Sequence, residues 1–221
     1  MAIQIQGSGG VVAEVDGTTF RALRVTSRPV DYGALGYYSA CAISGTIAAG
    51  LASNADIFQM RWTDGTRFAV VYRLILDGLS GSSTAFTAGF ASVRAFFSRA
   101  WSADGSGGTA LTLTGNNQKL RTSMGTTLMG AIRASSTAAL TAGTKTNDSQ
   151  PIGQFTFTIG TTASVIYANQ IVLLDEEDVG SQPAILSGTG GGEGLTVQAT
   201  VPATGTWQFG ITARWAEVTQ Y

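Results

Sequence analysis

Apolar and polar residues alternate along much of the second half of the chain. In residues 154–160 (QFTFTIG), Phe155, Phe157 and Ile159 share one parity, and threonines occupy the other. A period of two is typical of a strand with one buried face. Residues 195–201 and 206–218 are predicted to form a hairpin around a turn at 202–205. In the second strand of this hairpin, every second residue is apolar and is expected in the core: Trp207, Phe209, Ile211, Ala213 and Trp215.

Residues 54–78 (NADIFQMRWTDGTRFAVVYRLILDG) contain two apolar runs on either side of Asp64-Gly65. Asp-Gly between apolar runs is a strong signal for a hairpin with a two-residue loop. Such a loop pairs Trp62 with Arg67, whereas a one-residue bulge pairs Trp62 with Phe68. Either register leaves apolar side chains on both faces, although an antiparallel sheet usually keeps one face wet. We therefore expect a helix of the same chain, or another molecule, to cover the second face.

The period changes between residues 86 and 101. Ser83 or Thr84 could cap the start of a helix in this segment, and Asp104-Gly105 could end it. The apolar residues recur at intervals of four, three, four and four, which predicts one amphipathic helix near 86–101 as a cover for the hairpin: Phe86, Phe90, Val93, Phe97 and Trp101.

Short strands with Gly-rich turns favour a mainly β fold, a β-sandwich of jelly-roll type. The chain has 221 residues, a usual size for one all-β domain. Residues 1–19 are Gly-rich and hold few apolar groups, which predicts an extended N-terminal arm. Residues 20–221 are expected to form the single β-sandwich domain.

The arm is expected to lie on a neighbouring subunit. Its glycines add backbone entropy that folding must overcome, and an extended segment can offset this cost by adding a strand to an exposed sheet edge. The 54–78 hairpin is one such place, and the alternative is that residues 1–19 form an edge strand of their own sandwich. The candidate interface residues lie on the arm and on the hairpin: Ile3, Ile5, Val11, Val12, Ile57, Arg61, Val71 and Arg73.

Charged residues make up 12% of the chain, about half the usual ~25%. Of the 13 basic residues, only Lys119 and Lys145 are lysines. Arg is enriched and Lys depleted at protein interfaces, although a GC-rich genome produces the same bias. The net charge of −1 and the lack of a basic cluster argue against nucleic acid as the partner. No apolar run is long enough to span a membrane, and no signal peptide is visible, so we expect synthesis in the cytoplasm.

The residues of common enzyme sites are scarce. The chain has no histidine, which excludes Ser-His-Asp and Cys-His catalysis and most zinc sites. Cys41 is the only cysteine and is expected to be a small buried hydrophobe. The acidic run 175–178 is expected to be a solvated loop, with an interfacial patch or a cation site as alternatives. We expect no enzyme, no cofactor, no metal and no small-molecule substrate.

Two stretches, FQMRWTDGTRFAVVYRL within residues 54–78 and the ending EGLTVQATVPATGTWQFGITARWAEV, resemble tailed-bacteriophage virion proteins of the small β-sandwich type. The family is that of head decoration (cement) or related capsid-associated proteins. The resemblance implies a non-enzymatic structural role in the virion and self-association that is often threefold. It also implies contact with the major capsid protein or other virion proteins. The helix expected near 86–101 departs from a minimal decoration domain.

The sequence therefore predicts a phage capsid decoration or cement subunit, made in the host cytoplasm and located in the virion. It is expected to act by burying surface against copies of itself, with a trimer favoured, and against the capsid. The alternative is a carbohydrate- or receptor-binding module of a phage tail fibre or a bacterial surface. Three or more coplanar, exposed aromatic rings would favour that alternative.

Overall fold

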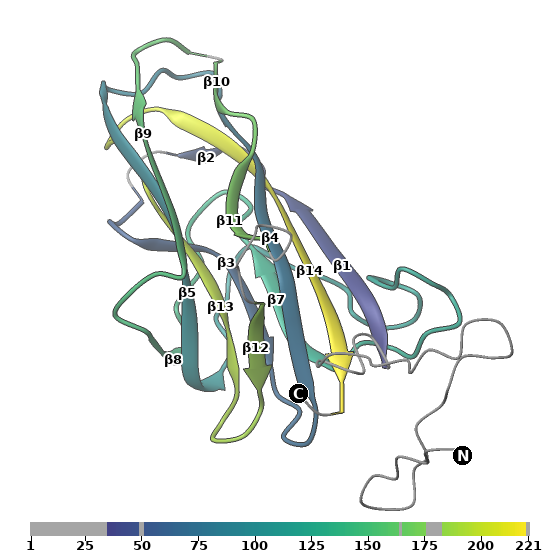
Figure 1. Ribbon diagram of the computed structural model, residues 1–221. Coiled ribbons are helices and arrows are strands. Elements are labelled where there is room, and N and C mark those ends of the chain that lie inside the picture. The colour runs from purple at the N-terminus through teal and green to yellow at the C-terminus, as the bar shows by residue number, and fades with distance from the viewer. Residues whose placement is uncertain (1–34, 49–50, 164, 176–182, 220–221) are drawn as a thin grey trace, which may run out of the picture.

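The computed structural model describes residues 35–48, 51–163, 165–175 and 183–219. Within these residues the protein is all β, with two seven-stranded antiparallel sheets that form a β-sandwich (Figure 1). No helix long and apolar enough to cross a membrane occurs in the described ranges. The N-terminal arm, residues 1–19, lies outside the described residues.

Sheet 1 is built around the long central strand β14. One edge is β1, and the opposite edge of β4 is shared by three short strands. Its members are β1 (Gly36–Ile43), β2 (Ile47–Ala48), β14 (Thr206–Val218), β4 (Phe68–Gly81), β10 (Ile166–Ala168), β11 (Ile171–Asp175) and β12 (Ala184–Ser187).

Sheet 2 packs against sheet 1 and has β13 at its centre, between β3 and β5. β7 and β6 extend it beyond β3, and β8 and β9 pair with different parts of β5. Its members are β6 (Thr109–Ala110), β7 (Met129–Ala134), β3 (Ala55–Trp62), β13 (Glu193–Thr200), β5 (Gly89–Ala103), β8 (Thr144–Asn147) and β9 (Gly153–Ile159).

Neither of the two predicted hairpins exists, because in each of them the two strands belong to different sheets. β3 lies in sheet 2 and β4 in sheet 1, and β13 and β14 are divided in the same way (Figure 1). The Asp64-Gly65 turn is nevertheless present. The Asp64 carboxylate accepts hydrogen bonds from the backbone N–H groups of Thr66 (2.8 Å) and Arg67 (2.9 Å). The sequence signal thus encodes the local turn, whereas sheet packing decides which strands pair.

The helix predicted near 86–101 is wrong, because the segment forms strand β5. β5 has apolar residues at both parities, and their spacing imitates that of a helix. Val93 points into the sandwich and Phe90 points out of it. Ala100 has a φ of 47°, and the pairing register shifts nearby, so Trp101 is again buried. The burial of this segment in the fold therefore decides its structure, and the 3.6-residue period of its apolar residues does not indicate a helix.

The core lies between the two sheets and contains the residues expected from the alternation in β14. Trp207, Phe209, Ile211, Ala213 and Trp215 are all buried there. Tyr38 of β1 stacks on Trp215 with ring centroids 5.5 Å apart. Burial of large aromatic side chains is the dominant favourable contribution to such a core.

The outer face of sheet 2 is covered by its own chain, with loop segments and β8 in place of the expected helix. Gly105 lies so close above Gln59 that an added Cβ would stand 2.4 Å from the Gln59 Oε1. Gln59 Nε2 in turn donates to the Thr141 carbonyl at 2.9 Å. Segments 104–108 and 136–147 thereby supply the cover that the apolar pattern of β3 requires.

A buried polar cluster ties this cover to the sheet. The Lys145 Nζ lies 2.6 Å from Asp56 Oδ2 and 4.7 Å from the centroid of the Trp101 ring. Gln59 and Gln198 each donate to the Asp56 carboxylate at 2.8 Å. Burial lowers the pKa of Lys145, and its hydrogen bond to Asp56 opposes that shift. The paired charges and the amide donors leave the cluster largely satisfied despite its burial.

We expect Trp207→Ala to lower the free energy of unfolding by about 3–5 kcal/mol, because it removes a large side chain from a closed core. Denaturant melts measure this loss. The neighbouring Gln208→Ala is the matched control, since Gln208 is exposed on the opposite face and should change stability by at most about 0.5 kcal/mol. A loss below about 1 kcal/mol for Trp207→Ala would contradict this account of the core.

Candidate interaction surface

The outer face of sheet 1 exposes apolar side chains near the C-terminal ends of β1 and β4 and on β10 and β11. We call this end of the face its upper part. Three of the seven large hydrophobic residues exposed in the described chain lie on it: Ile43 (85% exposed), Ile166 (69%) and Val172 (49%). The strand registers place them in three different rows of the sheet. Val172 pairs with Ile75, and Ile166 with Ser80. We call this area the outer-face surface, and it is the largest grouping of such residues on one face.

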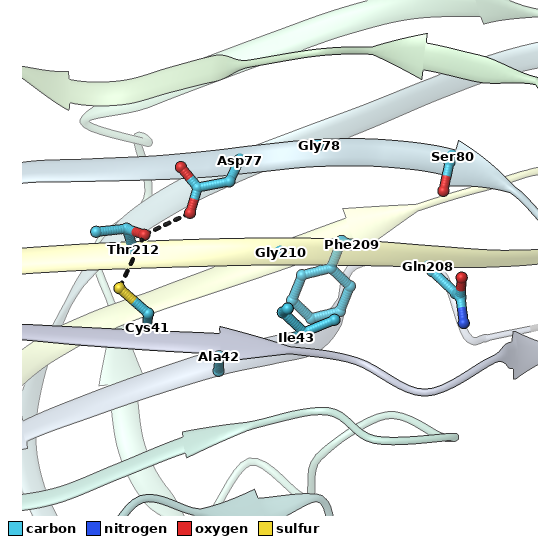
Figure 2. A pocket seen from close by; sticks show the side chains of 10 residues that line it. All are labelled: Cys41, Ala42, Ile43, Asp77, Gly78, Ser80, Gln208, Phe209, Gly210 and Thr212. Carbon is cyan, nitrogen blue, oxygen red and sulfur yellow. Dashed lines mark hydrogen bonds between the residues drawn. The ribbon is translucent and has the colours of Figure 1, made fainter.

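Two glycines hollow out the middle of this surface. Ile43 of β1 is opposite Gly210 of β14, and Gly210 is opposite Gly78 of β4, so the row across three strands has one side chain only. The resulting depression has a volume of about 410 Å³ and opens to the outside (Figure 2). Ile43 therefore lacks a neighbour in its own row, and its apolar surface stays exposed.

Polar side chains lie at both ends of the depression, with Ser80 and Gln208 at one end and Asp77, Thr212 and Cys41 at the other (Figure 2). Thr212 donates a hydrogen bond to the Asp77 carboxylate, and the Cys41 Sγ lies 3.3 Å from the same Thr212 hydroxyl (Figure 2). Cys41 is an exposed free thiol, so the prediction that it is a buried hydrophobe is wrong. Its side chain shares the outer face with Thr212 because the two residues are opposite each other in the β1–β14 register.

The lower half of the edge of β1 is occupied by a segment of the same chain. Ser39 donates to the Gln118 carbonyl at 2.9 Å, and Leu120 donates to the Tyr37 carbonyl at 3.2 Å. These bonds extend the sheet by a short irregular piece beside the base of β1.

The upper half of this edge is open. Peptide groups alternate in direction along a strand, so the N–H groups of Cys41 and Ile43 point to the same side as that of Ser39. Ser44 has the other parity and donates to Phe209 of β14. None of the described residues pairs with Cys41 or Ile43 on the outer side.

The residues named from the sequence as an interface do not gather at one place. Ile57 and Val71 are fully buried inside the sandwich and have no surface to offer a partner. Arg61 pairs with Asp104 at 2.8 Å, and Arg73 lies 3.4 Å from Asp175. The remaining four candidates lie outside the described residues: Ile3, Ile5, Val11 and Val12.

Sequence reasoning missed Ile43, Ile166 and Val172 as exposed residues. Each lies in or beside a run of apolar residues, and exposure depends on which face of which sheet the strand joins. The one available signal was the pair of glycines, Gly78 and Gly210, within long apolar strands, since glycine in a strand marks a site of close approach or missing packing.

The described residues contain no group of three or more His, Cys, Asp or Glu side chains that could hold a metal ion. Of the acidic run, only Asp175 is described, and it lies beside Arg73. No protein-family model, curated protein or solved structure matches this chain.

One buried acid stands out at the base of the sandwich. Glu217 accepts hydrogen bonds from the Thr127 hydroxyl, the Leu128 N–H (3.0 Å) and the Trp215 Nε1–H (3.2 Å). Burial raises the pKa of Glu217 above its ordinary value of 4.5, and these hydrogen bonds only partly oppose the shift.

The raised pKa makes the stability of the fold depend on pH. Because folded Glu217 binds its proton more tightly than unfolded Glu217, its contribution is fully present below the unfolded value near 4.5 and is lost as pH rises through the folded pKa. Glutamine has no such titration. We therefore expect the free energy of unfolding of the wild type, relative to Glu217→Gln, to fall as the pH rises from the ordinary value of 4.5 through the acidic to neutral range. Denaturant melts across this range check it, and a constant or rising difference would contradict it.

Proposed function

We propose that this protein is a non-enzymatic virion structural protein, a phage capsid decoration or cement subunit that self-associates and binds the capsid surface. The observation that supports this best is the outer-face surface, where Ile43 is exposed at the open edge of β1 and Ile166 and Val172 are exposed on the strands at the opposite edge of the sheet. Its partners in this proposal are further copies of the chain, with a trimer favoured, and the major capsid protein or other virion proteins.

The strand order supports a jelly roll within the sandwich. We count β8 and β9 as one strand position and β10 to β12 as another. Eight positions, numbered 1 to 8, then follow one another along the chain: β1, β3, β4, β5, β8–β9, β10–β12, β13 and β14. Sheet 1 then reads 1-8-3-6, and sheet 2 reads 2-7-4-5 with β7 and β6 added beside position 2. Double-sheet jelly rolls with this crossing of strands recur in viral capsid domains and in lectins.

The low charge of the chain fits the same role. With 12% charged residues and a net charge of −1, its surface has little electrostatic repulsion to keep copies apart. An interface of ~800 Å² per partner is enough for specific association. Repetition of such contacts on a capsid lattice increases the total affinity by avidity.

Sugar or receptor binding is the other function that a jelly roll suggests, and the aromatic side chains bear on it. All four tryptophans are buried: Trp62, Trp101, Trp207 and Trp215. The well-exposed rings of the described chain are Phe90 (74%) and Phe155 (41%), which point to opposite faces of sheet 2. The required platform of three coplanar rings is not formed by the described residues, so the structural role is the better supported proposal.

Association through apolar surface has a clear solution signature. We expect the isolated chain to elute as an oligomer, with a trimer favoured, in size-exclusion chromatography with light scattering at micromolar concentration. Because few charges are involved, about 1 M salt, which shortens the screening length to ~3 Å, should leave the mass unchanged. A stable monomer that also fails to bind capsids would contradict the proposed function.

A further inference from the structure

We propose that residues 2–6 of one copy add as a strand to the open edge of β1 in a second copy, beside Cys41 and Ile43. The inference rests on the proposed function insofar as both require self-association. It names the edge, the segment that occupies it, and the face on which the side chains of that segment lie.

The open edge supplies the acceptor. Along Ala40–Ile43 the outward peptide groups have no partner among the described residues, and the adjoining Ile43 side chain is 85% exposed. An exposed edge of this kind is a template for pairing with another strand. Main-chain hydrogen bonds then supply affinity, and alternate side chains supply specificity.

The 54–78 segment, which the sequence suggested as a place for the arm to pair, cannot accept an added strand. β3 lies between β7 and β13, and β4 lies between β14 and the short strands β10, β11 and β12, so neither has a free edge. β9 also forms an edge, but its start packs closely on β11, because a Cβ at Gly153 would stand 1.8 Å from the Leu173 carbonyl oxygen. The upper half of β1 is therefore the more accessible template.

Residues 2–6 (AIQIQ) have the pattern that this edge requires. Ile3 and Ile5 alternate with Gln4 and Gln6, the period of a strand with one apolar face. The first charged side chain of the sequence is Glu14, so this segment is as free of charge as Ala40–Ile43. With Ile3 and Ile5 on the outer face, the added strand covers the exposed flank of Ile43. The five residues are long enough to span the four of the open edge.

The geometry of the edge and the length of the preceding chain allow pairing between copies. A segment that turned back directly from Gly36 would pair first with the base of β1, where residues 118–120 already form hydrogen bonds. The 34 residues that precede Leu35 can span about 110 Å when extended, far enough to reach a neighbouring copy. The glycines at 7, 9 and 10 supply a pliable connection behind the paired segment.

Disulfide trapping with the native thiol tests the proposal. Cys41 is the only cysteine of the chain, is exposed, and points to the outer face. Ile5→Cys, oxidised with oxidised glutathione, should give a reducible band at twice the 22.8 kDa chain mass. Gln4→Cys is the matched control. Its side chain lies on the opposite face of the added strand and points away from Cys41, so this variant should give no dimer band.

A mixing experiment distinguishes pairing between two copies from pairing within one chain. Tagged Ile5→Cys/Cys41→Ala chains mixed with untagged wild-type chains should form a mixed disulfide dimer, because the linked cysteines come from different copies. A link within one Ile5→Cys chain would overturn the proposal in favour of pairing within the chain. A disulfide dimer of the wild type would overturn it in favour of direct pairing of two β1 edges.

Light scattering on the same samples distinguishes this inference from the proposed function. An oligomer in which neither Ile5→Cys nor Ile3→Cys links to Cys41 overturns the strand addition and leaves self-association standing. A monomer without any link overturns the strand addition, and it overturns the proposed function as well if the chain also fails to bind capsids. Equal linking of Ile5→Cys and Gln4→Cys would show a mobile arm near the edge and would also overturn the proposal.

Discussion

The long strands β3 and β4 bury side chains on both of their faces, and the rest of the structure follows from how that is achieved. The inner faces pack sheet against sheet around buried aromatic rings, among them Trp62, Trp207 and Trp215. Each such side chain removes on the order of 150–250 Å² from water. Because β3 and β4, and likewise β13 and β14, belong to opposite sheets, the connections between them join the two layers of the sandwich.

The outer faces are covered in different ways in the two sheets. Sheet 2 folds its own segments, 104–108 and 136–147, over β3 and secures them through the Asp56–Lys145 cluster. The upper part of sheet 1 has no comparable cover in the described chain, and there the apolar side chains of Ile43, Ile166 and Val172 remain exposed. The contrast between the two outer faces is what turns one of them into a candidate surface for association.

The local alternation of apolar and polar residues predicted many of the strands and core positions. It predicted the mainly β sandwich and the buried faces of β14 correctly, because the parity of side chains along a strand is a local property. Pairing is not local. The Asp64 turn and the turn at 202–205 were both present, yet each joins strands of different sheets. In β5, apolar residues at both parities produced a spacing that resembles a helix.

The candidate surface could not have been predicted from the sequence. The exposure of Ile43 depends on its position opposite Gly210, and on Gly78 beyond it, residues that are 167 and 35 positions away along the chain. The open half of the β1 edge likewise depends on where the distant segment 118–120 stops pairing. Both features arise from long-range register, which no local pattern of residues specifies.

Amide hydrogen exchange at Cys41 and Ile43 tests the central claim most directly, because their N–H groups point out from the open edge. In the assembled protein the account predicts slow exchange at both amides, and fast exchange in a chain that lacks residues 2–15 but melts at the same temperature. Equally fast exchange of these amides in the assembled and the shortened protein would contradict it.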